Sequence, residues 1–268
     1  MATIALQSAA SGLKALNTRL DVIANNLANA NTTGFKTSRA NFQDLLYVER
    51  AQPGVENANG DQRPTGLYVG LGVKVSGTQV QFGQGSPIAT DSELDMMITG
   101  DGFFQVAVDP DLGGGIAYTR AGNFTLNSQG EIVLANDQGR RLEPGITLDD
   151  DVESVAIDRN GRVSVRRSGQ TTVEEVGQIQ TANFINPAGL RQIGENLFVE
   201  SAASGPPVVG DPGTESRGAI QQGQLEASNV DPTRELIELI RTQRSFELNS
   251  QSIRAADEAL QTIGQLRR

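Results

Sequence analysis

The sequence of 268 residues predicts an α+β protein with one helix at each end, a mainly antiparallel β domain between them, and an extended connector. Two observations support this prediction. Both ends of the chain repeat apolar residues every seven positions, as helices with a narrow apolar seam do. From about residue 67 to the second helix, short β-branched or aromatic runs alternate with turn residues at roughly 8–12-residue spacing, as in all-β domains.

The N-terminal helix is predicted over residues 1–30. Its a and d positions hold Leu6, Ala9, Leu13, Leu16, Leu20, Ile23, Leu27 and Ala30. Gly12 and the asparagine-rich run 25–31 have low helix propensity, so they weaken the helix without breaking the repeat. Residues 32–34, Thr-Thr-Gly, are expected to end it.

The connector is predicted over residues 31–70, because this stretch has no clear helical or strand period. It contains the turn signals Pro53-Gly54, Asn59-Gly60 and Pro64-Thr65-Gly66. An extended path between the first helix and the β domain is therefore expected.

The β domain is predicted over residues 71–228. Two segments, 124–133 and 155–165, each read as a strand, a glycine-containing turn and a second strand. They are predicted to form antiparallel hairpins.

The C-terminal helix is predicted over residues 229–268, with Asp231 as its N-cap and Pro232 in its first turn. Its heptad positions hold Leu239, Thr242, Phe246, Asn249, Ile253, Ala256, Leu260 and Ile263. Neither terminal helix can bury its seam alone. The two seams must therefore meet each other or helices of neighbouring subunits, and we expect both ends to order on assembly.

Composition excludes several classes of function. The chain has no Cys, His or Trp, so it carries no thiolate or imidazole metal site and no Ser-His-Asp triad. Its net charge of −10 argues against a nucleic-acid partner. No stretch is apolar enough to insert into a membrane, and no secretory signal is recognised. We expect no catalytic residues, no metal and no cofactor.

The acidity is concentrated in the middle of the chain. Residues 1–30 carry a net charge of +1 and residues 229–268 a net charge of 0, so residues 31–228 carry −11. The two ends can therefore pack around a common axis with little net repulsion, whereas the acidic middle is better suited to an outer position.

Two functions from other classes stay open at this point. One is a carbohydrate-binding or adhesive β protein whose helices serve for oligomerisation. The other is a hydrolase that uses the carboxylates of Asp149, Asp151 or Glu153, although adjacent acids more often form a solvated loop.

Residues 20–36, LDVIANNLANANTTGFK, resemble the signature of the bacterial flagellar rod and hook proteins. The matching residues are Asn25, Asn26, Asn29, Thr32, Gly34 and Phe35. Residues 94–104, 118–124, 193–198 and 223–230 resemble further segments of the same family, so the likeness spans the chain. The length and the stretch around 46–66, which looks like a stiffening insertion, place the chain nearest to the distal-rod branch. The proximal-rod and hook branches are the alternatives.

This resemblance implies a structural subunit of a hollow helical shaft that transmits torque from motor to hook and forms part of the export channel. It implies that the helices pair in a coiled-coil-like inner tube with the β domain outside. The implied partners are copies of the chain, proximal rod proteins, hook protein, the surrounding L- and P-ring proteins and the export apparatus. The implied location is the periplasmic, envelope-spanning basal body, reached by export without a cleaved signal peptide.

The residues proposed for the assembly seam are the large apolar members of the two heptad patterns. They are Leu6, Leu13, Leu16, Leu20, Ile23, Leu27, Leu239, Phe246, Ile253, Leu260 and Ile263.

Overall fold

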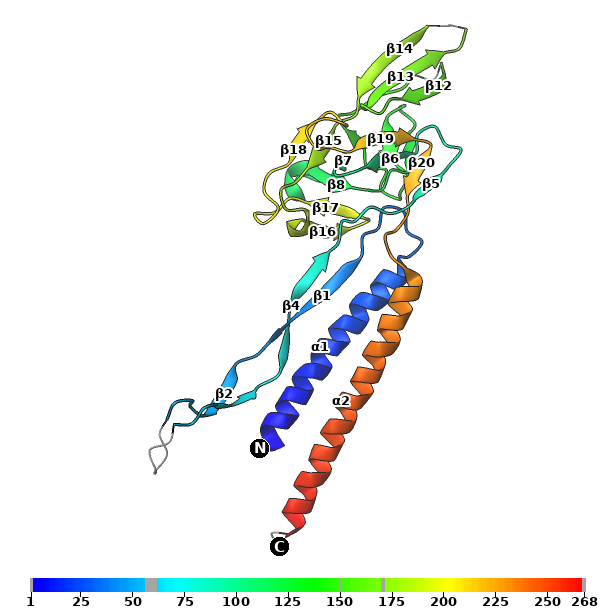
Figure 1. Cartoon of the computed structure of the whole chain (residues 1–268). Coiled ribbons are helices and arrows are strands. Elements are labelled where there is room, and N and C mark those ends of the chain that lie inside the picture. The colour runs from blue at the N-terminus through cyan, green and yellow to red at the C-terminus, as the bar shows by residue number, and fades with distance from the viewer. Residues whose placement is uncertain (1, 56–61, 150, 170–171, 267–268) are drawn as a thin grey trace. The chain divides into compact units, whose positions relative to one another are not determined.

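The computed structural model describes residues 2–55, 62–149, 151–169 and 172–266 (Figure 1). The predicted turn at Asn59-Gly60 lies outside these residues. The contacts divide the chain into two compact units. The helical unit comprises residues 1–28, 38–79 and 231–268, and the β-rich unit comprises residues 29–37 and 80–230. The chain therefore passes from one unit to the other four times.

Among its described residues, the helical unit contains two long helices and four strands. These are α1 (Ala2–Ala28), β1 (Ser38–Asp44), β2 (Tyr47–Ala51), β3 (Leu67–Gly70), β4 (Val73–Val80) and α2 (Pro232–Leu266). Strand β1 pairs with β4, and β2 pairs antiparallel with β3. Within the part of the chain that the structure describes, neither helix combines the length and the apolar character needed to cross a membrane.

Helices α1 and α2 lie side by side and run in opposite directions (Figure 1). Arg19 Nη2 contacts Glu238 Oε2 at 2.6 Å, and Asn249 Nδ2 donates to the Ala9 carbonyl oxygen at 3.2 Å. Residues later in α1 therefore lie opposite residues earlier in α2, so the two helices are antiparallel. The first and last segments of the chain thus share one unit.

The helix ends follow local chemistry. Asp231 Oδ1 accepts the backbone N–H groups of Thr233 at 3.0 Å and Arg234 at 3.2 Å, which confirms the predicted N-cap of α2. Helix α1 ends at Ala28, so the predicted heptad position at Ala30 lies beyond it.

The strand pair β1–β4 contacts α1 on a face other than the heptad seam. The Val73 N–H donates to Ser11 Oγ at 3.1 Å. Gly72 lies so close to Ser11 that a Cβ there would overlap the hydroxyl oxygen, and its φ of +117° also favours glycine. Helix α1 is thus covered on two sides, by α2 and by the strand pair.

The β-rich unit is built from antiparallel pairs. Its strands are β5 (Pro87–Ala89), β6 (Met96–Thr99), β7 (Phe103–Ala107), β8 (Ile116–Thr119), β9 (Phe124–Leu126), β10 (Ile132–Leu134), β11 (Leu142–Glu143), β12 (Val152–Ile157), β13 (Arg162–Arg167), β14 (Val173–Gln178), β15 (Thr181–Asn183), β16 (Arg191–Gly194), β17 (Leu197–Val199), β18 (Val208–Gly210), β19 (Ala219–Gln222) and β20 (Gln224–Glu226). The largest sheet has the order β16-β17-β8-β7-β15-β18, with β11 also on β7.

Both predicted hairpins are confirmed. Strand β9 pairs with β10, and β12 pairs with β13, each antiparallel. Strand β14 extends the second hairpin to a three-stranded sheet. The predicted α+β class with mainly antiparallel strands is therefore confirmed.

Strand β7 contributes to the apolar core on both of its faces. Phe103 and Phe104 are both buried, but they belong to two different clusters, because successive side chains of a strand point to opposite faces. Phe104 packs edge-on against Phe124, and Phe103 against Phe82 and Phe198. The aromatic residues of this aromatic-poor chain are thus concentrated in the β-rich unit.

Candidate assembly site

Most of the predicted seam residues of α1 and α2 are buried or half-buried, with two exceptions near the end of α2. Ile23 is buried, and the half-buried members are Leu6, Leu13, Leu16, Leu20, Leu27, Leu239, Phe246 and Ile253. Leu260 is 36% exposed, and the side chain of Ile263 lies outside the described residues.

The helix register explains why Leu260 is exposed. Because Arg19 lies opposite Glu238 and Ala9 opposite Asn249, Ala2 falls opposite Ala256. Leu260 is a further turn along α2, where no described residue of α1 faces it. Leu260 is therefore more exposed than the seam residues nearer the start of α2.

Small and polar seam positions allow the two helices to approach closely. A Cβ on Gly12 would lie 2.5 Å from Asn249 Nδ2, so the glycine that weakens helix propensity makes room for this side chain. Thr242 is buried, and its hydroxyl donates to the Glu238 carbonyl oxygen at 2.7 Å. The seam is therefore apolar with hydrogen-bonded positions inside it.

The asparagine-rich motif shapes the exit from α1. Asn26 is 2% exposed; its amide donates to the Ser38 carbonyl oxygen at 2.9 Å and its Oδ1 accepts the Ser38 N–H at 3.0 Å. Thr32 Oγ1 donates to Asn29 Oδ1 at 3.2 Å. Asn25 is exposed on the helix surface. Asn26 thus ties the end of α1 to the start of β1.

Gly34 is required by backbone geometry. Its φ is +71°, and a Cβ there would lie 2.5 Å from the Ala121 backbone nitrogen. Its N–H donates to the Glu226 carbonyl oxygen at 2.8 Å, and the neighbouring Phe35 carbonyl accepts from Asn229 at 3.4 Å. The motif therefore passes between two other segments of the β-rich unit.

Next to Gly34 lies a buried ion cluster formed by Lys36, Arg120 and Glu226. Lys36 Nζ contacts Glu226 Oε1 at 2.6 Å, and Arg120 Nη1 contacts Glu226 Oε2 at 3.5 Å. The Gly85 N–H also donates to Glu226 Oε1, at 2.7 Å. The three charged side chains are at most 3% exposed, so no substrate reaches them from solvent.

Main-chain carbonyls complete the environment of the two cations. Arg120 donates to the carbonyl oxygens of Ile98 at 3.2 Å and Gly100 at 2.7 Å, and Lys36 donates to that of Gly83 at 2.8 Å. Burial lowers the pKa of Lys36, and the carboxylate of Glu226 opposes this shift. The cluster is a hydrogen-bonded structural ion site.

Asn229 links the same segments by main-chain hydrogen bonds. Its Oδ1 accepts the Thr37 N–H at 2.8 Å, and its Nδ2 donates to the carbonyl oxygens of Gln81 at 2.8 Å and Gly83 at 3.1 Å. Residues 37, 81 and 229 all adjoin points where the chain passes between the two units. The β-rich unit thus holds these segments together by Asn229 and by the buried ion cluster.

Lys36, Arg120, Glu226 and Asn229 lie inside the family-like segments of the sequence, but no local pattern predicted a role for them. The sequence feature that could have identified such residues is a charge within a run of otherwise apolar or small residues, as in YTRAG at residues 118–122. This signal does not say which residues contact one another, because the partners are up to 192 positions apart.

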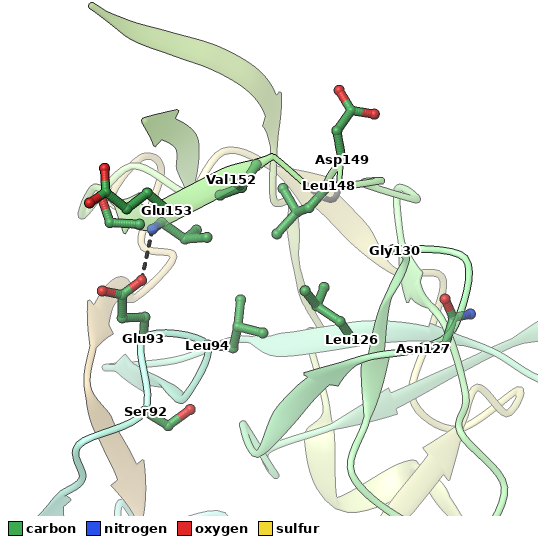
Figure 2. Close-up of a pocket in the computed structure, with 12 residues that line it drawn as sticks. Ser92, Glu93, Leu94, Leu126, Asn127, Gly130, Leu148, Asp149, Val152 and Glu153 are labelled. Atoms are coloured by element: carbon green, nitrogen blue, oxygen red, sulfur yellow. Dashed lines mark hydrogen bonds between the residues drawn. The ribbon is translucent and has the colours of Figure 1, made fainter. Parts of the chain in front are cut away.

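A cavity of about 510 Å³ lies in the β-rich unit beside β12 (Figure 2). Leu94 and Leu126 line one side and Leu148 and Val152 the other, as Figure 2 shows. At its edge Glu93 Oε2 accepts the Val155 N–H at 2.8 Å. Ser92, Glu93, Asn127, Asp149 and Glu153 also line it, so the cavity combines apolar and polar side chains.

The carboxylates of the hydrolase alternative are engaged by arginines. Asp149 and Asp151 both contact Arg167, at 2.9 and 3.5 Å, and Glu153 contacts Arg166 at 3.7 Å. All three acids are more than half exposed at the side chain. In the described ranges no three acidic, His or Cys side chains gather to hold a metal ion.

Three family models match the chain. They are the flagellar basal body rod protein model over residues 6–36, the flagellar hook protein FlgE/F/G D1 domain over residues 97–165, and the flagellar basal body rod FlgEFG protein C-terminal model over residues 221–266. The first covers the asparagine-rich motif, and the last covers Glu226, Asn229 and most of α2.

Curated relatives match over nearly the whole chain. The flagellar basal-body rod protein FlgG of Caulobacter vibrioides is 46% identical, covering 98% of this chain and 99% of its own. Proteins of the same name from Buchnera aphidicola subsp. Schizaphis graminum and Agrobacterium fabrum are 43% and 44% identical, each covering about 95% of both chains. A solved structure, the Helicobacter pylori hook protein FlgE2, covers 71% of this chain and 43% of its own at 16% identity, with a TM-score of 0.25.

These relatives are structural proteins of the flagellum and not enzymes. The asparagine-rich exit from α1, part of the antiparallel β-rich unit and most of the terminal helix pair lie within the regions that the family models match. The chain belongs to the flagellar basal-body rod protein FlgG family.

Proposed function

We propose that this chain is the structural subunit of the flagellar distal rod. Copies assemble into a rigid hollow helical shaft that transmits torque from the motor to the hook and encloses part of the export channel. A contact between two different faces of identical subunits does not close on itself and so generates a helical filament.

The observation that carries this proposal is the pairing of the two chain ends in one helical unit. Residues 1–30 and 229–268 would form a coiled-coil-like inner tube, residues 31–70 the connector, and residues 71–228 an outer layer. The near-neutral ends and the acidic middle support this assignment, because closely packed helices around a channel avoid net repulsion.

Charged substitutions in the seam test this proposal. Leu20→Glu or Ile253→Glu would place an unpaired carboxylate among packed helices, at a cost of about 3–5 kcal/mol per subunit. We expect no shafts in electron micrographs of cells that carry either variant. Near-UV circular dichroism of the purified chain should still report a folded β-rich unit.

Ser245→Glu and Ser252→Glu are the matched controls, because both side chains are exposed on α2 outside the seam. Shafts should form normally from both controls. Normal shafts from Leu20→Glu and Ile253→Glu would contradict the assigned seam.

The distal-rod assignment further rests on residues 46–66. Leu46, Tyr47 and Val48 are 82%, 57% and 36% exposed, and Val55 is 53% exposed. Such a cluster of exposed apolar side chains is typical of a contact surface. We propose that it wedges against neighbouring subunits and removes the freedom that a bending hook requires.

Deletion of residues 46–66 is expected to lower the bending stiffness of the shaft several-fold. The measurement is the curvature distribution of isolated shafts by electron microscopy. A second variant that combines Leu46→Ser, Tyr47→Ser and Val48→Ser keeps the length of the chain. It therefore distinguishes the effect of losing the apolar side chains from the effect of shortening the chain. Unchanged stiffness in the deletion variant would reject the wedge.

Partners and location follow from the same proposal. The shaft would contact proximal rod proteins, hook protein, the L- and P-ring proteins and the export apparatus, and would lie in the periplasmic part of the basal body. We also propose export without a cleaved signal peptide.

A further inference from the structure

Helix α2 carries a second apolar face outside the seam. Leu236, Ile237, Ile240 and Leu248 are 45%, 47%, 49% and 64% exposed, and they recur at helical spacing over three turns. The seam residues Leu239 and Phe246 on the same turns are half-buried against α1. We call these four exposed residues the outer face of α2.

Charges accompany this face. Arg241, Arg244 and Glu247 are exposed on the same side of the helix, between and beside the apolar residues. Helix α1 also has an exposed face, turned neither to α2 nor to the β1–β4 pair. It contains Ala10, Lys14, Asn17, Asp21, Ala24 and Ala28, which recur at three- and four-residue spacing.

The two faces are complementary in charge if they meet antiparallel. If Lys14 lies opposite Glu247, then Asp21, seven residues later in α1, lies opposite Ile240, seven residues earlier in α2. Asp21 is then beside Arg241 and one turn from Arg244. The same register sets Ala24 opposite Ile237. A single alignment thus places both charged residues of this face of α1 near opposite charges and leaves alanine facing an exposed isoleucine.

We propose that the outer face of α2 packs on the exposed face of α1 of a second copy of this chain. This rests on the proposed assembly into a shaft. Copies in such a shaft point the same way along its axis, so α1 of one copy and α2 of the next run antiparallel, as they do within one chain. The contact is heterologous and therefore repeats from copy to copy.

Cysteine cross-linking in isolated shafts tests the contact directly, because the chain contains no cysteine of its own. Ala24→Cys combined with Ile237→Cys should give, on oxidation, a ladder of dimers and larger multimers that a reductant removes. Each single variant should stay monomeric on the gel. The pair Ala24→Cys and Ser245→Cys is the matched control, since Ser245 is exposed and lies more than two turns along α2 from Ile237.

A charge exchange gives an independent test. Lys14→Glu and Glu247→Lys should each reduce the number of shafts per cell several-fold by opposing like charges, and the double variant should restore it. Assembled shafts that give no ladder, or a double variant no better than the single ones, would overturn this interface alone. Absence of shafts from the unaltered chain would instead overturn the proposed function.

Discussion

Replacing Glu226 by leucine is expected to lower the free energy of unfolding of the β-rich unit by about 3–5 kcal/mol. The change leaves Lys36 and Arg120 fully buried without their shared carboxylate. It also removes the acceptor of the Gly85 N–H. Removing one member of a buried ion pair lowers stability far more than replacing both members by apolar residues, because the remaining charge is neither solvated nor neutralised.

Calorimetry and near-UV circular dichroism are the measurements, since the chain has no tryptophan for fluorescence. Glu153→Leu is the matched control: its ion pair with Arg166 is half-exposed and should change stability by about 1 kcal/mol or less. If Glu226→Leu lowers the free energy of unfolding no more than Glu153→Leu does, the cluster contributes little to stability.

A double variant separates charge from packing. Lys36→Met together with Glu226→Leu removes both members of the 2.6 Å pair, so it should be less destabilised than Glu226→Leu alone. If the loss of stability in the double variant equals the sum of the losses in Lys36→Met and Glu226→Leu, the two side chains act independently.

Gly34→Ala is expected to destabilise the β-rich unit by about 2–4 kcal/mol, the second large effect. An alanine at φ of +71° is strained, and its Cβ would lie 2.5 Å from the Ala121 nitrogen and 2.8 Å from the Arg120 carbonyl carbon. Both neighbours are main chain, so neither can rotate away. The displacement of Arg120 would also disturb its contact with Glu226.

Gly114→Ala is the control for this prediction. Its φ is +74°, but no atom lies within 4 Å of the added Cβ, so only the backbone strain remains. The calorimetric melting temperature of Gly34→Ala should therefore fall clearly below that of Gly114→Ala. Equal melting temperatures would mean that the protein relieves the close contact of the added Cβ with residues 120–121 without losing stability.

Local patterns predicted much of this molecule. The seven-residue repeats located both helices, and nearly all of the large apolar repeat positions with described side chains are half-buried or buried. Leu260 is the exception, because its exposure depends on where α1 begins relative to α2, and no pattern within α2 carries that information.

The sequence by itself determined the α+β class, the helix pair's apolar positions, the N-cap at Asp231 and the family likeness, because side-chain periodicity and capping depend on residues within a few turns. Only the tertiary structure decided that Lys36, Arg120 and Glu226 share one buried site, and that α2 keeps a second apolar face exposed. Such contacts join residues up to 190 positions apart. They depend on the path of the whole chain, which local spacing does not record.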